Sequence, residues 1–546
     1  MNNIVKASLA ALSIGQAVSL NAQKPNFVIM MTDQQRADLT EREGYPLDLT
    51  PFADRMGQEG AWFSHAYTSC PASAPARISM LTGRFPRYTR ADSNHNIDDA
   101  FFGKDLFTVA KEAGYQTILV GKNHTYMTKE SADWWIPFNH LGEEGPKDGA
   151  SDEDRGFDEF LGKTSFYASM KPSPYGVEHQ IPYRMVTKAL EWIKEHGEEK
   201  PFVMILSFPE PHNPYQVCEP YFSMFDGKIP PARTDSTALD IKGEKFRQLY
   251  TMMGKGHKGF SENIDRLRAN YMGMIRLLDD QMERFVDGVK ALGEYDSTTF
   301  VITSDHGDYA GEYGLMKKGA GVVDAITRIP MVWFGNGVAK SGERADHISI
   351  VDIMPTACEK MGMEIPQGVQ GRSLTEMLAG RNYPIEEFSS IISEAGFGGQ
   401  YITKEDRTDY IKEGSMRKNG LFFDELNTWS QSGTISMVRK GDWKLVMDMH
   451  GKGELYNMKK DPSEMDNLFG SKKYLENSAG CLQAVSEHQG RRYPGRDDAG
   501  TSEMGNRTQR SDSCPETQIP FQEVRPQLSV CGIAEWRHDG QRCLPP

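Results

Sequence analysis

The stretch PNFVIMMTD, residues 25–33, decides the fold class. It is an almost unbroken run of apolar side chains that opens with a proline and closes with a carboxylate, Asp33. A strand that is covered on both faces has such a continuous apolar pattern, whereas a strand with one wet face alternates. We therefore predict a buried parallel strand over residues 25–33.

The same pattern recurs along the chain, separated by helical segments. Buried strands are predicted over residues 116–120, 201–212 and 298–308, and helices over residues 105–113 and 271–292, where apolar residues recur at helical spacing. Helices that alternate with buried strands are typical of α/β proteins with a mainly parallel sheet. We expect a large mixed, mainly parallel sheet that is flanked by helices.

Polar, reactive residues follow directly on several of these apolar runs. They are Asp33, Lys122, His212 and Asp305. In open α/β sheets the ligand crevice lies outside the carboxyl ends of the strands. We therefore expect these four side chains to converge, although they are far apart in the sequence.

The N-terminal 22 residues and the C-terminal third differ in pattern from this domain. Residues 1–22 contain one lysine and a run of small apolar residues that ends in Leu20-Asn21-Ala22. This pattern predicts a secretory signal peptide and therefore a periplasmic or secreted protein. A buried first helix is the alternative. The predicted catalytic domain spans residues 23–386. Alternating apolar and polar residues predict a smaller antiparallel subdomain over 387–479. Residues 480–546 have no apolar period and predict a disordered tail.

Composition and charge exclude some classes of partner. The chain has 546 residues, of which 38% are hydrophobic, so it can bury a large core. A net charge of -14 argues against nucleic acid and anionic membranes as general partners, and no other segment reaches the ~20 apolar residues of a membrane span. An anionic substrate would need a local cluster of cations or a metal.

The seven cysteines do not indicate a disulfide framework in the main body of the chain. Four of them, Cys481, Cys514, Cys531 and Cys543, fall near the C-terminus, and no Cys-x-x-Cys pair exists. A structural zinc site is therefore not expected.

The segment TSCPASAPARISMLTGRFP, residues 68–86, contains two nucleophile types, Cys70 and Ser73. Pro75 in the first turn and Gly83 just past the end fit a short helix that starts near Ser73. A helix N-terminus favours a bound anion because its N–H groups are free and its dipole is positive there. Taken alone, the segment could equally be an ordinary capped helix.

Ser73-x-Pro75-x-Arg77, followed by Leu81-Thr82-Gly83-Arg84, resembles the signature of the type I sulfatases of the alkaline-phosphatase superfamily. Counted from Cys70, the corresponding positions are alanines, so Ser73 matches the signature and Cys70 does not. The resemblance implies an alkaline-phosphatase-like fold. It also implies that Ser73 is oxidised to formylglycine by a radical-SAM maturase, and thus a bacterium that lives without oxygen.

Five more blocks resemble the same family and occur in its order, from residue 25 to about residue 470. They are PNFVIMMTDQQ, GKNH, PEPHNP, SDHGDYAGEYGLMKKG and GDWKLV…ELYNMKKDPSEMDNL. Each block alone would be a weak signal, but their common order makes the resemblance specific.

The resemblance implies a metal site formed by Asp33, Gln34, Ser73, Asp305 and His306. Carboxylate oxygens suit a hard divalent cation, and the family implies calcium. Many relatives have a second Asp in place of Gln34 and an Asn in place of His306. Because imidazole is a poorer ligand for calcium than for manganese or zinc, another divalent cation stays open.

The resemblance also assigns roles to the remaining polar residues. Lys122 and Lys318 would neutralise the sulfate oxygens. Arg77 would hold the formylglycine hydrate and the metal site in place, and His124 would bind the hydrate. His212 is the candidate for protonating the leaving alcohol.

The sequence thus predicts a sulfuric ester hydrolase, and predicted export favours a sulfated carbohydrate as its substrate. Two alternatives stay open. The TDQQ stretch is also similar to phosphonate monoester or phosphodiester hydrolases and choline sulfatases of the same superfamily. If Ser73 stays unmodified, the chain would be a non-catalytic binder of sulfated glycans.

Overall fold

A computed structural model describes residues 24–145, 150–164, 167–257, 259–398, 426 and 430–491. All of these residues belong to one compact unit, Met1–Pro494. The predicted signal peptide, residues 1–22, and residues 492–546 of the predicted tail lie outside the described residues.

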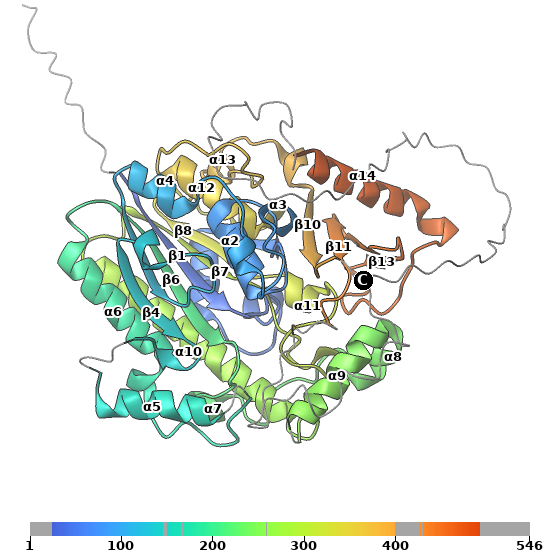
Figure 1. Ribbon diagram of the computed structural model, residues 1–546, viewed down its shortest axis with the longest axis horizontal. Helices are drawn as coiled ribbons and strands as arrows, with labels where there is room; N and C mark the ends of the chain where they lie inside the picture. The colour runs from blue at the N-terminus through green and yellow to red at the C-terminus, as the bar shows by residue number, and fades with distance from the viewer. Residues whose placement is uncertain are drawn as a thin grey trace, which may run out of the picture. The chain divides into compact units, whose positions relative to one another are not determined.

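The core of this unit is a nine-stranded sheet with the order β5-β4-β3-β6-β1-β7-β8-β2-β9 (Figure 1). Strands β4, β3, β6, β1 and β7 are parallel to one another, whereas β8 is antiparallel to both of its neighbours and β9 is parallel to β2. The predicted mixed, mainly parallel sheet is therefore confirmed. The strands are β1 (Asn26–Asp33), β2 (Ala61–Tyr67), β3 (Gln116–Gly121), β4 (Trp134–Asn139), β5 (Gly142–Glu143), β6 (Phe202–Pro211), β7 (Thr298–Ser304), β8 (Met331–Gly335) and β9 (Gly342–Ser349).

Strand β1 lies inside the sheet between β6 and β7, and all eight of its residues are buried. Successive side chains of a strand point to opposite faces. Phe27, Ile29 and Met31 pack into the core on one face of the sheet, and Val28 and Met30 pack into the core on the other. This two-sided burial explains why the strand is apolar at every position.

Helices cover both faces of the sheet (Figure 1). Helices α1, α6 and α10 contribute to one core, and α2, α4 and α12 contribute to the other. Asp105 caps α4 by accepting a hydrogen bond from the backbone N–H of Thr108. The helices are α1 (Pro51–Glu59), α2 (Ser73–Thr82), α3 (Pro86–Thr89), α4 (Leu106–Glu112), α5 (Asp152–Lys163), α6 (Ile181–His196), α7 (Tyr221–Met224), α8 (Leu239–Lys242), α9 (Glu244–Gly256), α10 (Ile264–Ala291), α11 (Asp324–Thr327), α12 (Ile353–Lys360), α13 (Thr375–Leu378) and α14 (Leu475–Arg491).

A separate four-stranded antiparallel sheet follows near the C-terminus, as the alternating pattern predicted. Its order is β10 (Ser390–Ala395), β11 (Ile435–Lys440), β12 (Trp443–Asp448) and β13 (Gly453–Asn457), and α14 packs against it. Helix α14 continues beyond residue 479, where the sequence prediction placed the start of a disordered tail. Cys481 and Ala484 of this helix are buried in the core and His488 is buried as well, so packed residues continue to at least His488.

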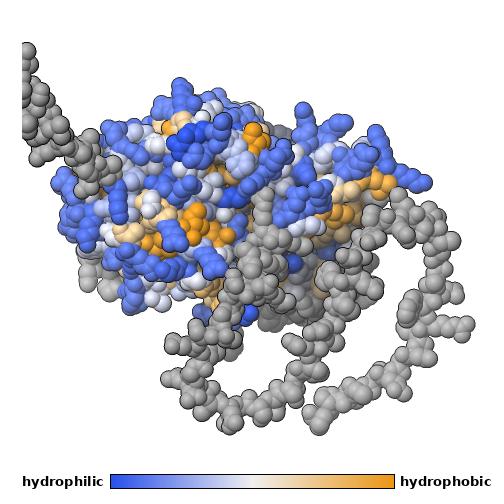
Figure 2. Space-filling view, turned by 90° about the horizontal axis from the view of Figure 1, so that it is seen from above, coloured by the Kyte–Doolittle hydropathy of each residue, from blue (hydrophilic) through white to orange (hydrophobic). Residues whose placement is uncertain are grey.

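The four cysteines within the described residues are buried and unpaired by disulfide: Cys70, Cys218, Cys358 and Cys481. Among the described residues we find no helix whose length and apolar character would let it cross a membrane. The face shown in Figure 2 is mostly hydrophilic, with small apolar patches between hydrophilic residues. Scattered exposed apolar side chains of this kind are normal for a folded domain.

Candidate active site

Four neighbouring parallel strands, β3, β6, β1 and β7, bring their carboxyl ends to one edge of the sheet. Strand β1 ends at Asp33, and Lys122, His212 and Asp305 directly follow β3, β6 and β7. The four residues that the sequence analysis placed at strand ends therefore do lie at the same edge. This is the position at which ligands bind in open α/β sheets.

Helix α2 begins at Ser73 and directs this residue at the strand ends. The Ser73 Oγ lies 3.0 Å from Nε2 of His306, and Ser73 is buried. Cys70 packs instead into a separate small cluster with Ala72 and Leu426, and burial raises the pKa of its thiol. Ser73, rather than Cys70, is thus the nucleophile type that faces the strand ends.

Arg77, one helical turn after Ser73, links two strand ends to helix α2. Its Nε donates to Oδ2 of Asp305 at 2.9 Å, and its Nη2 donates to Oδ2 of Asp33 at 3.1 Å. Its Nη1 donates to Oγ of Ser207 at 2.6 Å. Because these side chains are buried, the guanidinium compensates charges that water does not reach.

Asp33, Asp305 and His306 form a buried cluster in which one ligand atom of each lies within 4.8 Å of the others. Oδ1 of Asp33 is buried and has no hydrogen-bond partner among the described residues. Buried polar atoms normally have a partner. An unpartnered carboxylate oxygen beside a second carboxylate and an imidazole therefore fits a divalent cation.

The protonation states of this cluster also fit a cation. Burial would raise the pKa of Asp33, but the charges of Lys122, His212 and Arg77 outweigh burial and hold this pKa well below 3.8. Burial lowers the pKa of His306 to about 4, even though Asp305 acts in the opposite direction. Nδ1 of His306 lies 2.9 Å from the carbonyl oxygen of Gly307, so the proton resides on Nδ1 and Nε2 presents its lone pair to the cluster.

Gln34 connects the cluster to Lys318. Its amide oxygen accepts a hydrogen bond from Nζ of Lys318 at 2.7 Å, and its Nε2 donates to Oδ2 of Asp308 at 2.7 Å. The amide oxygen that we predicted as a metal ligand is thus an acceptor for an ammonium group here. Asp308, which the sequence analysis did not select, is buried and also accepts from the hydroxyl of Tyr215; burial raises the pKa of Asp308 to about 6.

The ammonium of Lys122 lies between Asp33 and His140. It donates to Oδ2 of Asp33 and lies 3.0 Å from Nε2 of His140. The sequence analysis missed His140, because no strand was predicted over the only partly buried run WWIPFN, residues 134–139. His140 directly follows the apolar strand β4.

Three histidines border the site on its more open side. His124, His140 and His212 are half-buried, whereas Ser73, Arg77, Lys122, Lys318 and the carboxylate cluster are buried. Nδ1 of His124 has no hydrogen-bond partner among the described residues. A ligand would therefore meet the histidines before it reaches the cations and carboxylates.

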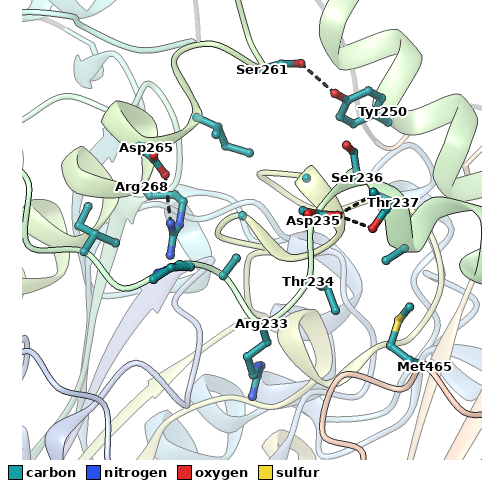
Figure 3. A pocket seen from close by; sticks show the side chains of 17 residues that line it. Arg233, Thr234, Asp235, Ser236, Thr237, Tyr250, Ser261, Asp265, Arg268 and Met465 are labelled. Carbon is teal, nitrogen blue, oxygen red and sulfur yellow. Dashed lines mark hydrogen bonds and ion pairs between the residues drawn. The ribbon is translucent and has the colours of Figure 1, made fainter.

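A different cavity, of about 570 Å³, lies elsewhere in the unit and contains none of these residues. Figure 3 shows that its polar side chains bond to one another: Asp265 contacts Arg268, Asp235 contacts Thr237, and Tyr250 contacts Ser261. Its polar groups are thus largely satisfied within the protein.

Comparisons with known proteins agree with the fold and the site. Residues 25–363 match the sequence model of the family described as Sulfatase. An arylsulfatase of Clostridium perfringens is 26% identical over 83% of this chain and 92% of its own length. An N-acetylglucosamine-6-O-sulfatase of Bacteroides thetaiotaomicron is 24% identical over 88% of this chain and 89% of its own. The structure of a phosphonate monoester hydrolase of Agrobacterium radiobacter superposes with a TM-score of 0.68 at 21% identity, over 86% of this chain and 96% of that one.

Proposed function

The chain belongs to the sulfatase family and is a sulfuric ester hydrolase, and we propose that it removes sulfate from a sulfated carbohydrate with a formylglycine made from Ser73 and a divalent cation. The observation that most supports this proposal is the set of side chains around the Oγ atom of Ser73. Two carboxylates, one neutral imidazole and three cationic side chains converge on one strand edge around it. These three cations, together with a bound divalent cation, would let a chain with a net charge of -14 bind an anionic ester.

The residues that would hold the cation are Asp33, Gln34, residue 73, Asp305 and His306. Two hard carboxylates favour calcium, while the imidazole of His306 leaves manganese or zinc open. When bound, the cation would lower the pKa of a hydroxyl at residue 73 and offset negative charge on the sulfate. Gln34 would have to share its amide oxygen between this cation and Lys318.

Oxidation of Ser73 would change its chemistry. An ordinary serine hydroxyl is a weak nucleophile. As a hydrated aldehyde, residue 73 would supply one hydroxyl that attacks sulfur and a second that allows the sulfate to leave afterwards. Because Ser73 is only 1% exposed, we expect the radical-SAM maturase to act on the chain before it folds.

The surrounding side chains bind and orient the ester in this scheme. Lys122 and Lys318 balance the charge of the sulfate oxygens, and Arg77 holds the two carboxylates in position. His124 lies at the more open side, where it would contact the hydroxyls of residue 73.

His212 is the candidate that protonates the leaving alcohol. Its Nδ1 lies 2.8 Å from the carbonyl oxygen of Asn213, so its Nε2 is the atom that can serve the ester oxygen. Burial, together with His140 and Lys318, holds the pKa of His212 well below 6.5 without a substrate. A bound sulfate ester brings a negative charge that favours the protonated ring.

The proposed substrate is a sulfated sugar, and the proposed location of the protein is the periplasm or the medium outside the cell. The similarity to an N-acetylglucosamine-6-O-sulfatase supports the sugar. The N-terminal sequence pattern supports a periplasmic or secreted location. A phosphonate monoester or choline-sulfatase-like activity is the second candidate, because the strand β1 block TDQQ is similar to those enzymes and a phosphonate monoester hydrolase shares the fold.

The test uses protein that is co-expressed with a radical-SAM maturase. Mass spectrometry of the peptide that contains residue 73 should show the loss of two hydrogens. Sulfated mono- and disaccharides, an aryl sulfate, choline sulfate and an aryl phosphonate are then assayed in parallel. Ser73→Ala should abolish turnover, whereas Cys70→Ala should retain it. Normal turnover by Ser73→Ala would refute the scheme, and glycan binding by unconverted protein without turnover would favour the non-catalytic alternative.

A further inference from the structure

His140 contacts two residues that have roles in the proposed reaction, Lys122 and His212. Its ring stacks on the ring of His212, with centroids 4.0 Å apart and an interplanar angle of 24°. Its Nε2 lies 3.0 Å from Nζ of Lys122. One imidazole therefore contacts both the cation for the sulfate and the candidate proton donor.

The hydrogen bonds of His140 define its tautomer. Nδ1 lies 3.1 Å from the backbone carbonyl oxygen of Pro209, which can only accept, so Nδ1 carries the proton. Nε2 then presents a lone pair, and the ammonium of Lys122 can only donate. Both contacts are satisfied by a neutral ring, and neither would suit the opposite tautomer.

A neutral His140 suits both neighbours. Burial and the charge of Lys122 hold its pKa well below 6.5, which agrees with an uncharged ring. A neutral ring can stack on a protonated His212 with little repulsion and offers its π-face to that charge. Within the described residues, Asp33 and His140 accept two of the three ammonium hydrogens of Lys122, and the third is left for a sulfate oxygen.

We propose that His140 is a positioning residue for sulfate ester hydrolysis, which aims the ammonium of Lys122 through its Nε2 and fixes the ring of His212 by stacking. The inference rests on the proposed function. In the step that it serves, an ionised hydroxyl oxygen of the hydrated aldehyde at residue 73 forms a bond to sulfur, the bond between sulfur and the ester oxygen breaks, and the electron pair of the broken bond stays on the ester oxygen. The oxygen takes the proton from Nε2 of His212, which returns to the neutral ring.

Two substitutions separate the two contacts. His140→Phe keeps a ring that can stack but loses the acceptor for Lys122. His140→Gln keeps an acceptor near the position of Nε2 but loses the ring. His196→Phe is the matched control, because the His196 ring packs 4.5 Å from Trp134 at the opposite end of the same strand, β4. All variants are matured, and their thermal unfolding and conversion at residue 73 are measured first.

Each variant is assayed with a sulfated sugar, whose alcohol needs a proton to leave, and with 4-nitrophenyl sulfate, whose phenolate leaves without one. For His140→Phe we expect kcat/KM to fall about tenfold on both substrates, because a hydrogen bond to a charged group is lost. For His140→Gln we expect a fall of about 100-fold on the sugar sulfate and little change on the aryl sulfate, because general acid catalysis is impaired. His196→Phe should match the wild type.

Two results would overturn the inference while leaving the proposed function intact. In the first, both His140 variants keep wild-type kinetics on both substrates. In the second, His140→Gln loses the same proportion of activity on the two substrates, which is what a merely structural role predicts. Wild-type protein that is fully converted at residue 73 and yet inactive on every sulfate ester would instead overturn the proposed function, and the inference with it.

Discussion

Replacing Arg77 with glutamine tests how the charges of the site are balanced. In the structure the guanidinium donates to Asp33 at 3.1 Å and to Asp305 at 2.9 Å, and both carboxylates are fully buried. Arg77→Gln removes the positive charge but keeps a polar side chain of moderate size. Asp305 then loses its guanidinium, and among the described residues the ammonium of Lys122 is the one cation that still donates to Asp33.

The size of the effect follows from these contacts. Each charge-assisted hydrogen bond contributes about 1.5–3 kcal/mol, and removing one partner of a buried ion pair costs about 3–5 kcal/mol. Since glutamine can replace part of the hydrogen bonding, we expect the metal-free protein to lose about 4 kcal/mol of unfolding free energy. A divalent cation between the carboxylates would supply the missing charge, so calcium should stabilise Arg77→Gln more than the wild type.

Urea unfolding in EDTA and in excess calcium measures both quantities. Arg84→Gln is the matched control: Arg84 is equally buried and follows the same helix, but it donates to the backbone carbonyls of Thr82 and Gln367 and to no carboxylate among the described residues. It should be destabilised without any added response to calcium. If Arg77→Gln unfolds at the wild-type urea midpoint in EDTA, or responds to calcium only as Arg84→Gln does, the charge balance described here is wrong.

Three further predictions concern the metal, the pH and the backbone beside the site. EDTA should abolish turnover and added calcium restore it; recovery with manganese or zinc alone would show that the imidazole ligand dominates the choice of ion. In the metal-free protein, the contribution of ionised Asp33 to the unfolding free energy is complete above its ordinary pKa of 3.8 and is lost as the pH falls toward its lower folded pKa. Asp33→Asn should therefore make the unfolding free energy, measured between about pH 2 and pH 6, less dependent on pH at the acid end of this range. Gly121 has φ 108°, and a Cβ there would lie 2.1 Å from the carbonyl oxygen of Ser207. Gly121→Ala should therefore lower the free energy of unfolding by about 1–3 kcal/mol and lower turnover by displacing Lys122. An unchanged urea midpoint and unchanged turnover would contradict this.

Site residues could be predicted from the sequence where a reactive side chain lies at the boundary of a strand or helix. Asp33, Lys122, His212 and Asp305 each follow an apolar run, and the structure places all four at strand ends. One functional strand end was not predicted. His140 directly follows strand β4, but this strand is only partly buried and contains Pro137, so its apolar pattern is weaker than that of β1, β6 or β7.

Contacts between distant segments could not be read from the sequence in this way. Asp308 binds Gln34, and Gln34 binds Lys318 across 284 residues of chain. Nothing in the local pattern of these residues specifies their partners. Likewise, the apolar pattern after residue 479 is too weak to predict a helix, but α14 packs against the four-stranded sheet, and tertiary contacts supply what local preference lacks.

By itself, the sequence determined which segments are buried on both sides, approximately where they end, and that a short helix starts near Ser73; the choice of Ser73 over Cys70 came from the resemblance to the sulfatase signature. These properties depend on local patterns of apolar side chains and on the spacing of Pro, Gly and Arg. Only the tertiary structure decided that β3, β6, β1 and β7 lie side by side, and therefore that their terminal residues form one site. The physical reason is that the apolar pattern of a strand indicates how deeply it is buried but not which strand it pairs with. Strand pairing depends on the connections between the strands and on the packing of the whole sheet.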